Sequence, residues 1–247
     1  MSSLTCESIE MMREELKERW NVRVTTKFKD IEKAERLYEY WVYLTLIYSL
    51  LEVAKQSKFS EEKALVYQPT KWEGSCPVRG TTILGVTIWS QPILVLDVDE
   101  ILSKHGGALP ELREFIKRGV GGIKEHCFPD FIVTEGEYWK LDLGRRGLVD
   151  LGLMLIECKH AKVELYDISQ FLWYVLAWNA RGRKVGALVC QRRLSASLRD
   201  KLSRDLSYLR GQGYNAIVVE EFKLGDKERC IKTMKELVKR CSIPHSY

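Results

Sequence analysis

The sequence predicts an α/β protein built around a mixed central sheet, and three observations lead to this fold class. After residue 127, short apolar runs typical of strands alternate with segments of helical spacing. The run LMLI at 153–156 is continuously apolar, as in a buried strand. The segment 31–57 is apolar nearly all round in its middle, which indicates a long buried helix.

The first half of the chain mixes helices and strands. Residues 5–19 have helical spacing and many charges, which predicts a short amphipathic helix. A loop or short strand then runs to Asp30, which can cap the long helix. Turn residues separate three further expected strands from one another, and a short helix, ELREFIKRG, follows them. These strands are expected at 64–70, 78–89 and 92–99.

The second half alternates more regularly. The segment 139–151 is interpreted as two strands joined by a turn at GRRG. The other strands are expected at 128–136, 153–160, 184–191 and 214–222, and the helices at 167–180, 195–211 and 226–241.

Bulk composition is that of an ordinary globular protein. Of 247 residues, 45% are hydrophobic and 30% charged, and the net charge of +5 permits a polyanionic partner without requiring one. The apolar run at 40–53 is shorter than a membrane span. The N-terminus lacks the basic region and apolar core of a signal peptide. We therefore expect a cytoplasmic protein with no membrane partner.

Cysteine usage argues against a structural zinc site. The seven cysteines form no CxxC pair, and only four histidines are present, so we expect buried thiols with at most one disulfide. Asn and Gln together number nine, which is typical of a thermophilic source. Disulfides can persist inside such cells.

The end of the strand at 153–160 carries an unusual pair of charges. Period two places Glu157 and Lys159 on one face of the strand and Cys158 on the other. Two ions leave water at a cost unless each finds a partner. The pair is either a salt bridge at a strand end or half of a metal site, and the triplet alone does not decide between them.

Four other residues are candidates for a functional site, and each also has a simpler structural explanation. Asp130 in FPDF begins a strand, where Pro–Asp pairs are common. Gln170 and Tyr174 share a helical face, but Gln170 also fits a capping box begun by Asp167, and Tyr174 fits a core position. Glu39 lies in an apolar stretch of the long helix, where a carboxylate needs a partner.

The order of these residues resembles that of the PD-(D/E)XK nuclease superfamily. The Pro129–Asp130 pair and the Glu157-Cys158-Lys159 triplet match its two strand motifs, and QFLWY at 170–174 is similar to the QxxxY motif of its RecB-like branch. The helix IEKAERLYEYWVYLTLIYSLLE also looks like the one that opens the nuclease domain of McrC-like restriction relatives. The resemblance covers about 30–57 and 127–191 and implies a restriction-endonuclease-like core, with a mixed central sheet flanked by helices.

The resemblance implies Mg²⁺-dependent hydrolysis of phosphodiester bonds, with Mn²⁺ as a substitute. Asp130, Glu157, Glu39 and the Cys158 carbonyl would hold the metal, since hard cations prefer oxygen ligands. Lys159 would orient the attacking water or stabilise developing charge, and Gln170 and Tyr174 would position the DNA strand beside the site. Nucleic-acid contacts are expected from Tyr174 and from two basic clusters expected near one end of the sheet, Arg181 with Arg183 and Arg192 with Arg193. The turn that holds Arg145 and Arg146 is either a loop that contacts DNA or a solvated turn. Asp97 and Asp99 receive no role.

Three segments follow from this interpretation. Residues 1–29 form an N-terminal helical segment, 30–191 the nuclease-like core with a β-rich insertion near 58–126, and 192–247 a C-terminal α/β extension. The expected partner is nucleic acid, DNA first. A non-cutting binding module and a nuclease subunit of a larger restriction or repair assembly remain alternatives, as does a homodimer. Because the chain has no GxxxxGK[ST] motif, any motor ATPase would be a partner protein.

Overall fold

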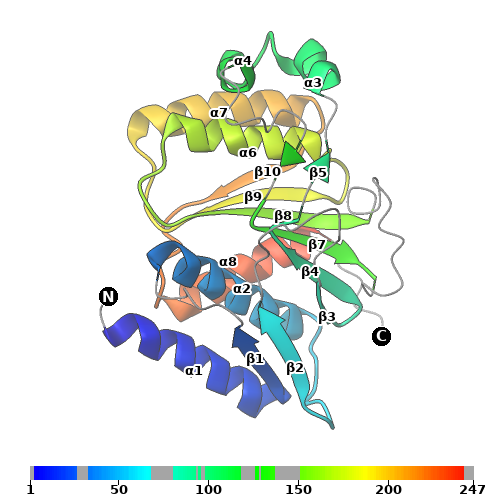
Figure 1. The fold of residues 1–247 in the computed structure, drawn as a ribbon, viewed down its shortest axis with the longest axis vertical. Helices are drawn as coiled ribbons and strands as arrows, with labels where there is room; N and C mark the ends of the chain where they lie inside the picture. The colour runs from blue at the N-terminus through cyan, green and yellow to red at the C-terminus, as the bar shows by residue number, and fades with distance from the viewer. Residues whose placement is uncertain are drawn as a thin grey trace.

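The computed structural model describes residues 3–26, 33–67, 80–92, 94–95, 98–117, 126–127, 129–136 and 151–241. A six-stranded mixed sheet forms the centre, in the order β10-β9-β8-β7-β4-β3 (Figure 1). Its strands are β3 (Thr81–Ile83), β4 (Val86–Ser90), β7 (Phe131–Glu135), β8 (Gly152–Lys159), β9 (Val185–Cys190) and β10 (Ala216–Val219).

Helices cover both faces of this sheet. Helices α2 (Ala34–Val53) and α8 (Lys227–Arg240) lie on one face, and α6 (Leu165–Ala177) and α7 (Ala196–Gly211) on the other (Figure 1). Each face has its own hydrophobic core: Ile156 and Cys158 pack on the α2 side, and Leu155 packs on the α6 side. The structure thus confirms the expected α/β class, with a mixed sheet flanked by helices.

The sheet divides into a parallel and an antiparallel half. Strands β8, β9 and β10 pair in parallel, with α6 and α7 as the crossover helices, while β7, β4 and β3 pair antiparallel. The carboxyl ends of β8, β9 and β10 therefore meet at one end of the sheet, where β7 begins.

Helix α2 is buried along most of its length, as expected. It begins at Ala34 after the N-cap Lys33, while Asp30, the predicted cap, lies outside the described residues. On its outer side pack α1 (Ser3–Trp20), which confirms the helix expected at 5–19, and a parallel pair made of β1 (Val22–Thr26) and β2 (Lys63–Tyr67). In the described part of the chain, no helix has the length and apolar character needed to cross a membrane.

Two strand predictions were wrong between residues 78 and 99. The strand expected at 78–89 is a hairpin of β3 and β4, because Leu84 and Gly85 take positive φ of 52° and 68° and turn the chain. Of the strand expected at 92–99, the described residues include β5 (Leu94–Val95), which pairs with β6 (His126–Cys127), whereas Val98 and Asp99 belong to a helix. Helix α3 (Val98–His105) then begins, with Asp99 in its first turn, where negative charge is favourable.

The region 58–126, expected as a β-rich insertion, contributes to several parts of the fold. It supplies β3 and β4 to the central sheet and also carries two helices, α3 and α4 (Pro110–Lys117), which lie over α6 and α7 (Figure 1). The C-terminal segment likewise adds β10 to the same sheet. The division of the chain into segments 1–29, 30–191 and 192–247 stays a prediction. Free thiols are carried by Cys6, Cys158, Cys190, Cys230 and Cys241.

Candidate active site at one end of the central sheet

Strands β7 and β8 bring the two predicted motifs together. Their register pairs Phe131 with Ile156, so Asp130, the residue before β7, faces Glu157. The Cys158 N–H donates a hydrogen bond of 2.7 Å to Asp130 Oδ2. Cys158 points its side chain into the α2 core, which confirms that it lies on the opposite face from Glu157 and Lys159.

Lys159 connects the end of β8 to helix α6. Its Nζ lies 3.0 Å from Glu157 Oε1 and 3.2 Å from Asp167 Oδ1, and it donates a hydrogen bond of 3.1 Å to Gln170 Oε1. Burial lowers the pKa of Lys159, but Glu157 and Asp167 outweigh burial and hold this pKa above its usual value. Lys159 is therefore a fixed cation with three oxygen neighbours on two elements.

Glu157 is only partly satisfied by this ion pair. The residue is 4% exposed, and its second oxygen, Oε2, is buried without a hydrogen-bond partner among the described residues. Burial raises the pKa of Glu157 to about 7, against the lowering effect of Lys159. A buried, unpartnered carboxylate oxygen is costly, so the salt bridge alone does not explain this glutamate.

Glu39 reaches the same end of the sheet from helix α2. Its Oε2 accepts hydrogen bonds from Arg36 at 2.6 Å and from the Tyr67 hydroxyl at 3.2 Å. Burial and then Asp130 raise the pKa of Glu39 to about 8, although Arg36 opposes the shift. Burial and Glu157 likewise raise the pKa of Asp130 well above its usual value. Three carboxylates therefore repel one another at one place.

Gln170 does not cap helix α6, so that alternative is wrong. The N-cap is Glu164, whose backbone N–H donates to Asp167 Oδ2 at 2.8 Å. Gln170 Oε1 instead accepts from Lys159, and its Nε2 donates to the Tyr174 hydroxyl at 2.8 Å. Tyr174 is 5% exposed, so it positions Gln170 and has little surface to offer a nucleic acid.

We expect Gln170→Glu to lower activity at the candidate site by about tenfold or more while leaving the fold intact. The new carboxylate would add negative charge where Glu157 and Asp167 already share Lys159, which disfavours an incoming phosphate. Cleavage rates and thermal unfolding of the variant and the wild type would check this. Wild-type cleavage by a stably folded Gln170→Glu would remove Gln170 from the site.

The two basic clusters do not lie together, contrary to expectation. Because β8 and β9 are parallel, Met154 pairs with Val185 at one end and Lys159 with Cys190 at the other. Arg192 and Arg193, both exposed, therefore follow β9 at the end where Lys159 lies.

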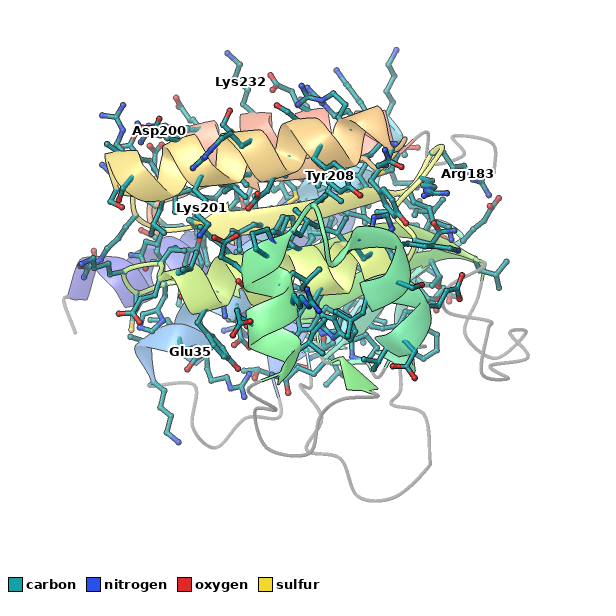
Figure 2. All side chains as sticks on the ribbon, turned by 90° about the horizontal axis from the view of Figure 1, so that it is seen from above. Glu35, Arg183, Asp200, Lys201, Tyr208 and Lys232 are labelled. Atoms are coloured by element: carbon teal, nitrogen blue, oxygen red, sulfur yellow. The ribbon has the colours of Figure 1, made fainter. Side chains whose placement is uncertain are left out.

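The other cluster precedes β9 and lies at the far end. Arg183 pairs there with Glu135 at 2.5 Å, and Arg181 lies over the Tyr214 ring at 4.2 Å. Figure 2 shows Arg183 on the opposite side of the molecule from Glu35, which lies one turn before Glu39. Arg145 and Arg146 lie outside the described residues.

Three neighbours of the site were not predicted as functional. Asp167 was considered only as a helix cap, although its spacing of three from Gln170 places both side chains on one stripe of α6. Arg36 is likewise three residues before Glu39 on α2, a spacing that could have indicated the pair. Tyr67 ends β2, and no sequence signal connects it with Glu39.

The side chains at this end of the sheet carry oxygen atoms suited to a hard cation, but they are not arranged as a complete metal site. Within the described ranges, no three side chains of His, Cys, Asp or Glu are grouped so as to hold a metal ion as they stand. The free Glu157 Oε2 and the raised pKa values of Asp130 and Glu157 nevertheless fit a cation, which would relieve their repulsion. Glu39 Oε2 already accepts hydrogen bonds from Arg36 and Tyr67. Glu39 therefore fits a position outside direct contact with the cation, behind Asp130 and Glu157.

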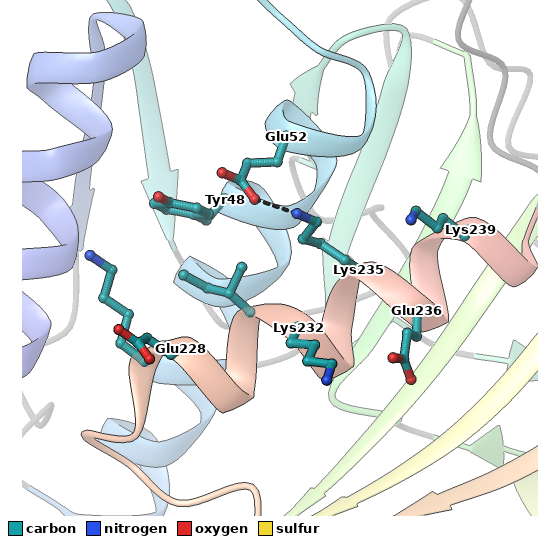
Figure 3. A pocket seen from close by; sticks show the side chains of 9 residues that line it. Tyr48, Glu52, Glu228, Lys232, Lys235, Glu236 and Lys239 are labelled. Atoms are coloured by element: carbon teal, nitrogen blue, oxygen red, sulfur yellow. Dashed lines mark hydrogen bonds and ion pairs between the residues drawn. The ribbon is translucent and has the colours of Figure 1, made fainter.

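A cavity of about 570 Å³ lies between α2 and α8 (Figure 3). Its charged lining alternates in sign, and Lys235 is paired with Glu52 at 2.7 Å. None of the predicted site residues lines it; the lining residues are Tyr48, Glu52, Lys227, Glu228, Ile231, Lys232, Lys235, Glu236 and Lys239. The candidate active site is thus distinct from this cavity.

Comparisons with known proteins give no family for this chain, so its function is argued from the geometry of the candidate site. No family model matches the chain, and no curated protein or solved structure matches it either.

Proposed function

We propose that this protein is a metal-dependent nuclease that hydrolyses phosphodiester bonds in DNA by the PD-(D/E)XK mechanism on a restriction-endonuclease-like core. The observation that carries the proposal is that Asp130, Glu157 and Lys159 meet at one end of the sheet. There, the buried Oε2 atom of Glu157 has no hydrogen-bond partner among the described residues. A plain salt bridge would satisfy both partners and would not place two further carboxylates beside it, the buried Glu39 and the partly buried Asp130.

Asp130 and Glu157 would hold Mg²⁺, with the Cys158 carbonyl as a further oxygen and Glu39 behind them. The bound cation would supply a Lewis acid and lower the pKa of a coordinated water. Because both carboxylates have raised pKa values, the protein must release protons when the metal binds, and metal affinity should rise with pH.

Lys159 would bind the scissile phosphate and stabilise the charge that develops on it. It is kept charged by its two acidic neighbours, and Gln170 fixes its direction through the hydrogen bond to Oε1. Arg192 and Arg193, exposed at the same end of the sheet, are positioned to contact neighbouring phosphates without reading base sequence.

Incubation with linear, circular and single-stranded DNA is the direct test. Cleavage is expected with Mg²⁺ or Mn²⁺ and is expected to vanish with EDTA, because in the proposed mechanism the bound metal activates the attacking water. Undiminished cutting in excess chelator would reject the mechanism. Tight binding without cutting under every condition would favour the non-cutting module, and cutting only after an ATPase is added would favour the subunit of a larger assembly.

A further inference from the structure

The first turn of α6 exposes two apolar side chains beside the candidate active site. Leu165 is 39% exposed and Tyr166 is 43% exposed. The next residue, Asp167, contacts Lys159 Nζ. The other large hydrophobic side chains that are exposed in the described part of the chain, Met11 and Val66, lie on α1 and β2. An apolar patch therefore borders the place where a phosphate would bind.

Tyr166 is held in position by helix α4. Its ring centroid lies 5.0 Å from that of Phe115, at an angle of 59° between the ring planes. Phe115 is itself partly buried against the α6 core, so it supports the tyrosine ring from one side. Tyr166 precedes Gln170 by four residues and is its neighbour on the helix surface. A supported aromatic ring thus meets solvent next to the residues that surround Lys159.

We propose that Tyr166 stacks against an unpaired base of the substrate strand, so that the site takes single-stranded nucleic acid or a frayed end. This inference rests on the proposed function. In a duplex the base faces are covered by neighbouring bases, whereas an unpaired base offers a free face to an aromatic ring. Lys159 would bind the phosphate of the strand whose base lies on Tyr166.

The size of the patch favours a base over a protein partner. A stable protein interface buries roughly 800 Å² on each side, which two exposed side chains on one helical turn do not provide. One nucleobase needs only one supported ring. Glu164 and Asp167, next to Tyr166, are acidic and repel phosphates. The attraction for the phosphates must therefore come from the cations Lys159, Arg192 and Arg193.

The test compares an oligo-dT with an all-abasic strand of the same length, which keeps the phosphates and lacks the bases. Binding is measured by fluorescence anisotropy in EDTA, so that no strand is cut. We expect Tyr166→Ala to weaken oligo-dT binding by roughly five- to 150-fold, the range of stacking on one aromatic side chain, and to leave the abasic strand unaffected. Tyr166→Phe, which keeps the ring, and Met11→Ala, which removes a more exposed apolar side chain on α1, should both bind oligo-dT like the wild type.

Equal affinities of the wild type for the two strands would overturn the inference, and so would an equal loss on both strands in Tyr166→Ala. The outcome is independent of catalysis. If the wild type cuts with Mg²⁺ and Tyr166→Ala binds oligo-dT normally, the stacking role is refuted and the nuclease function is supported. If the protein never cuts but binds oligo-dT through Tyr166, the stacking role is supported and the nuclease function is refuted.

Discussion

Lys159→Met is expected to abolish cleavage and also to destabilise the protein, whereas Glu157→Gln is expected to abolish cleavage alone. Removing one group that stabilises transition-state charge typically costs about 100- to 1,000-fold in rate, and removing a metal ligand costs at least as much. Loss of cleavage in both variants therefore follows from the proposed roles. The two variants differ in what they leave behind in the folded protein.

Lys159→Met leaves Glu157 buried beside Asp130 without its cation. The side chains of Glu157 and Lys159 are only 5% and 22% exposed, so the pair is poorly screened by solvent. Breaking a buried pair by removing one partner is strongly destabilising, and with partial exposure at Lys159 we expect about 2–3 kcal/mol near pH 8. Glu157→Gln instead removes a charge that already lacks a partner for Oε2, and Lys159 keeps Asp167 at 3.2 Å. Its stability should equal or exceed that of the wild type in EDTA.

The double variant Glu157→Gln/Lys159→Met separates the two effects. It removes both charges together, so most of the lost stability should return while cleavage stays absent. The matched control is Lys104→Met, which breaks the Lys104–Glu100 pair on α3, where both side chains are more than half exposed. That variant should keep normal stability and cleavage. Denaturant unfolding and cleavage rates give both readouts, and a Lys159→Met variant that still cuts would refute the role of Lys159.

Local pattern was enough to predict which way the charged residues at the end of β8 face. Period two on β8 correctly assigned Glu157 and Lys159 to one face, because a strand buried on both faces permits no slip of register. The link between Asp130 and this triplet came from the family resemblance and not from the strand pattern, and β7 and β8 are neighbours in the sheet. Helix α2 was correctly expected to be buried, since few of its central residues suit solvent.

Features set by tertiary contacts were harder to predict. Gln170 fits both a cap and a site residue in sequence, and only the position of Lys159 decides between them. The turn at Leu84 and Gly85 was missed because a leucine with positive φ carries no turn signal. The separation of the two arginine clusters was in fact predictable: a helix between two strands implies a parallel crossover, and this places Arg181 and Arg192 at opposite ends of β9.

In the absence of divalent metal, the protein is expected to lose stability as the pH rises from 6.5 to 8.5. The pKa of Glu39 is raised to about 8 and that of Glu157 to about 7, from about 4.5 in the unfolded chain. Across this window the folded protein therefore holds more protons than the unfolded chain, so each pH unit costs up to about 1.4 kcal/mol per retained proton. Below pH 4.5 the contribution of these two groups is fully present, because both states are protonated.

The expected loss is about 2–3 kcal/mol over the window, or roughly 4–12 °C in Tm for a chain of this size. Glu39→Gln should flatten the profile, because its neutral side chain can still accept from Arg36 and Tyr67 while it no longer repels Asp130. The exposed Glu61→Gln is the matched control and should leave the profile unchanged. Mg²⁺ should stabilise the wild type most at high pH, where it no longer competes with protons for the carboxylates. Thermal unfolding at five pH values, with EDTA or Mg²⁺, measures all of this. A flat profile in EDTA, or an equal Mg²⁺ effect at every pH, would mean that these carboxylates do not form one coupled, metal-responsive cluster.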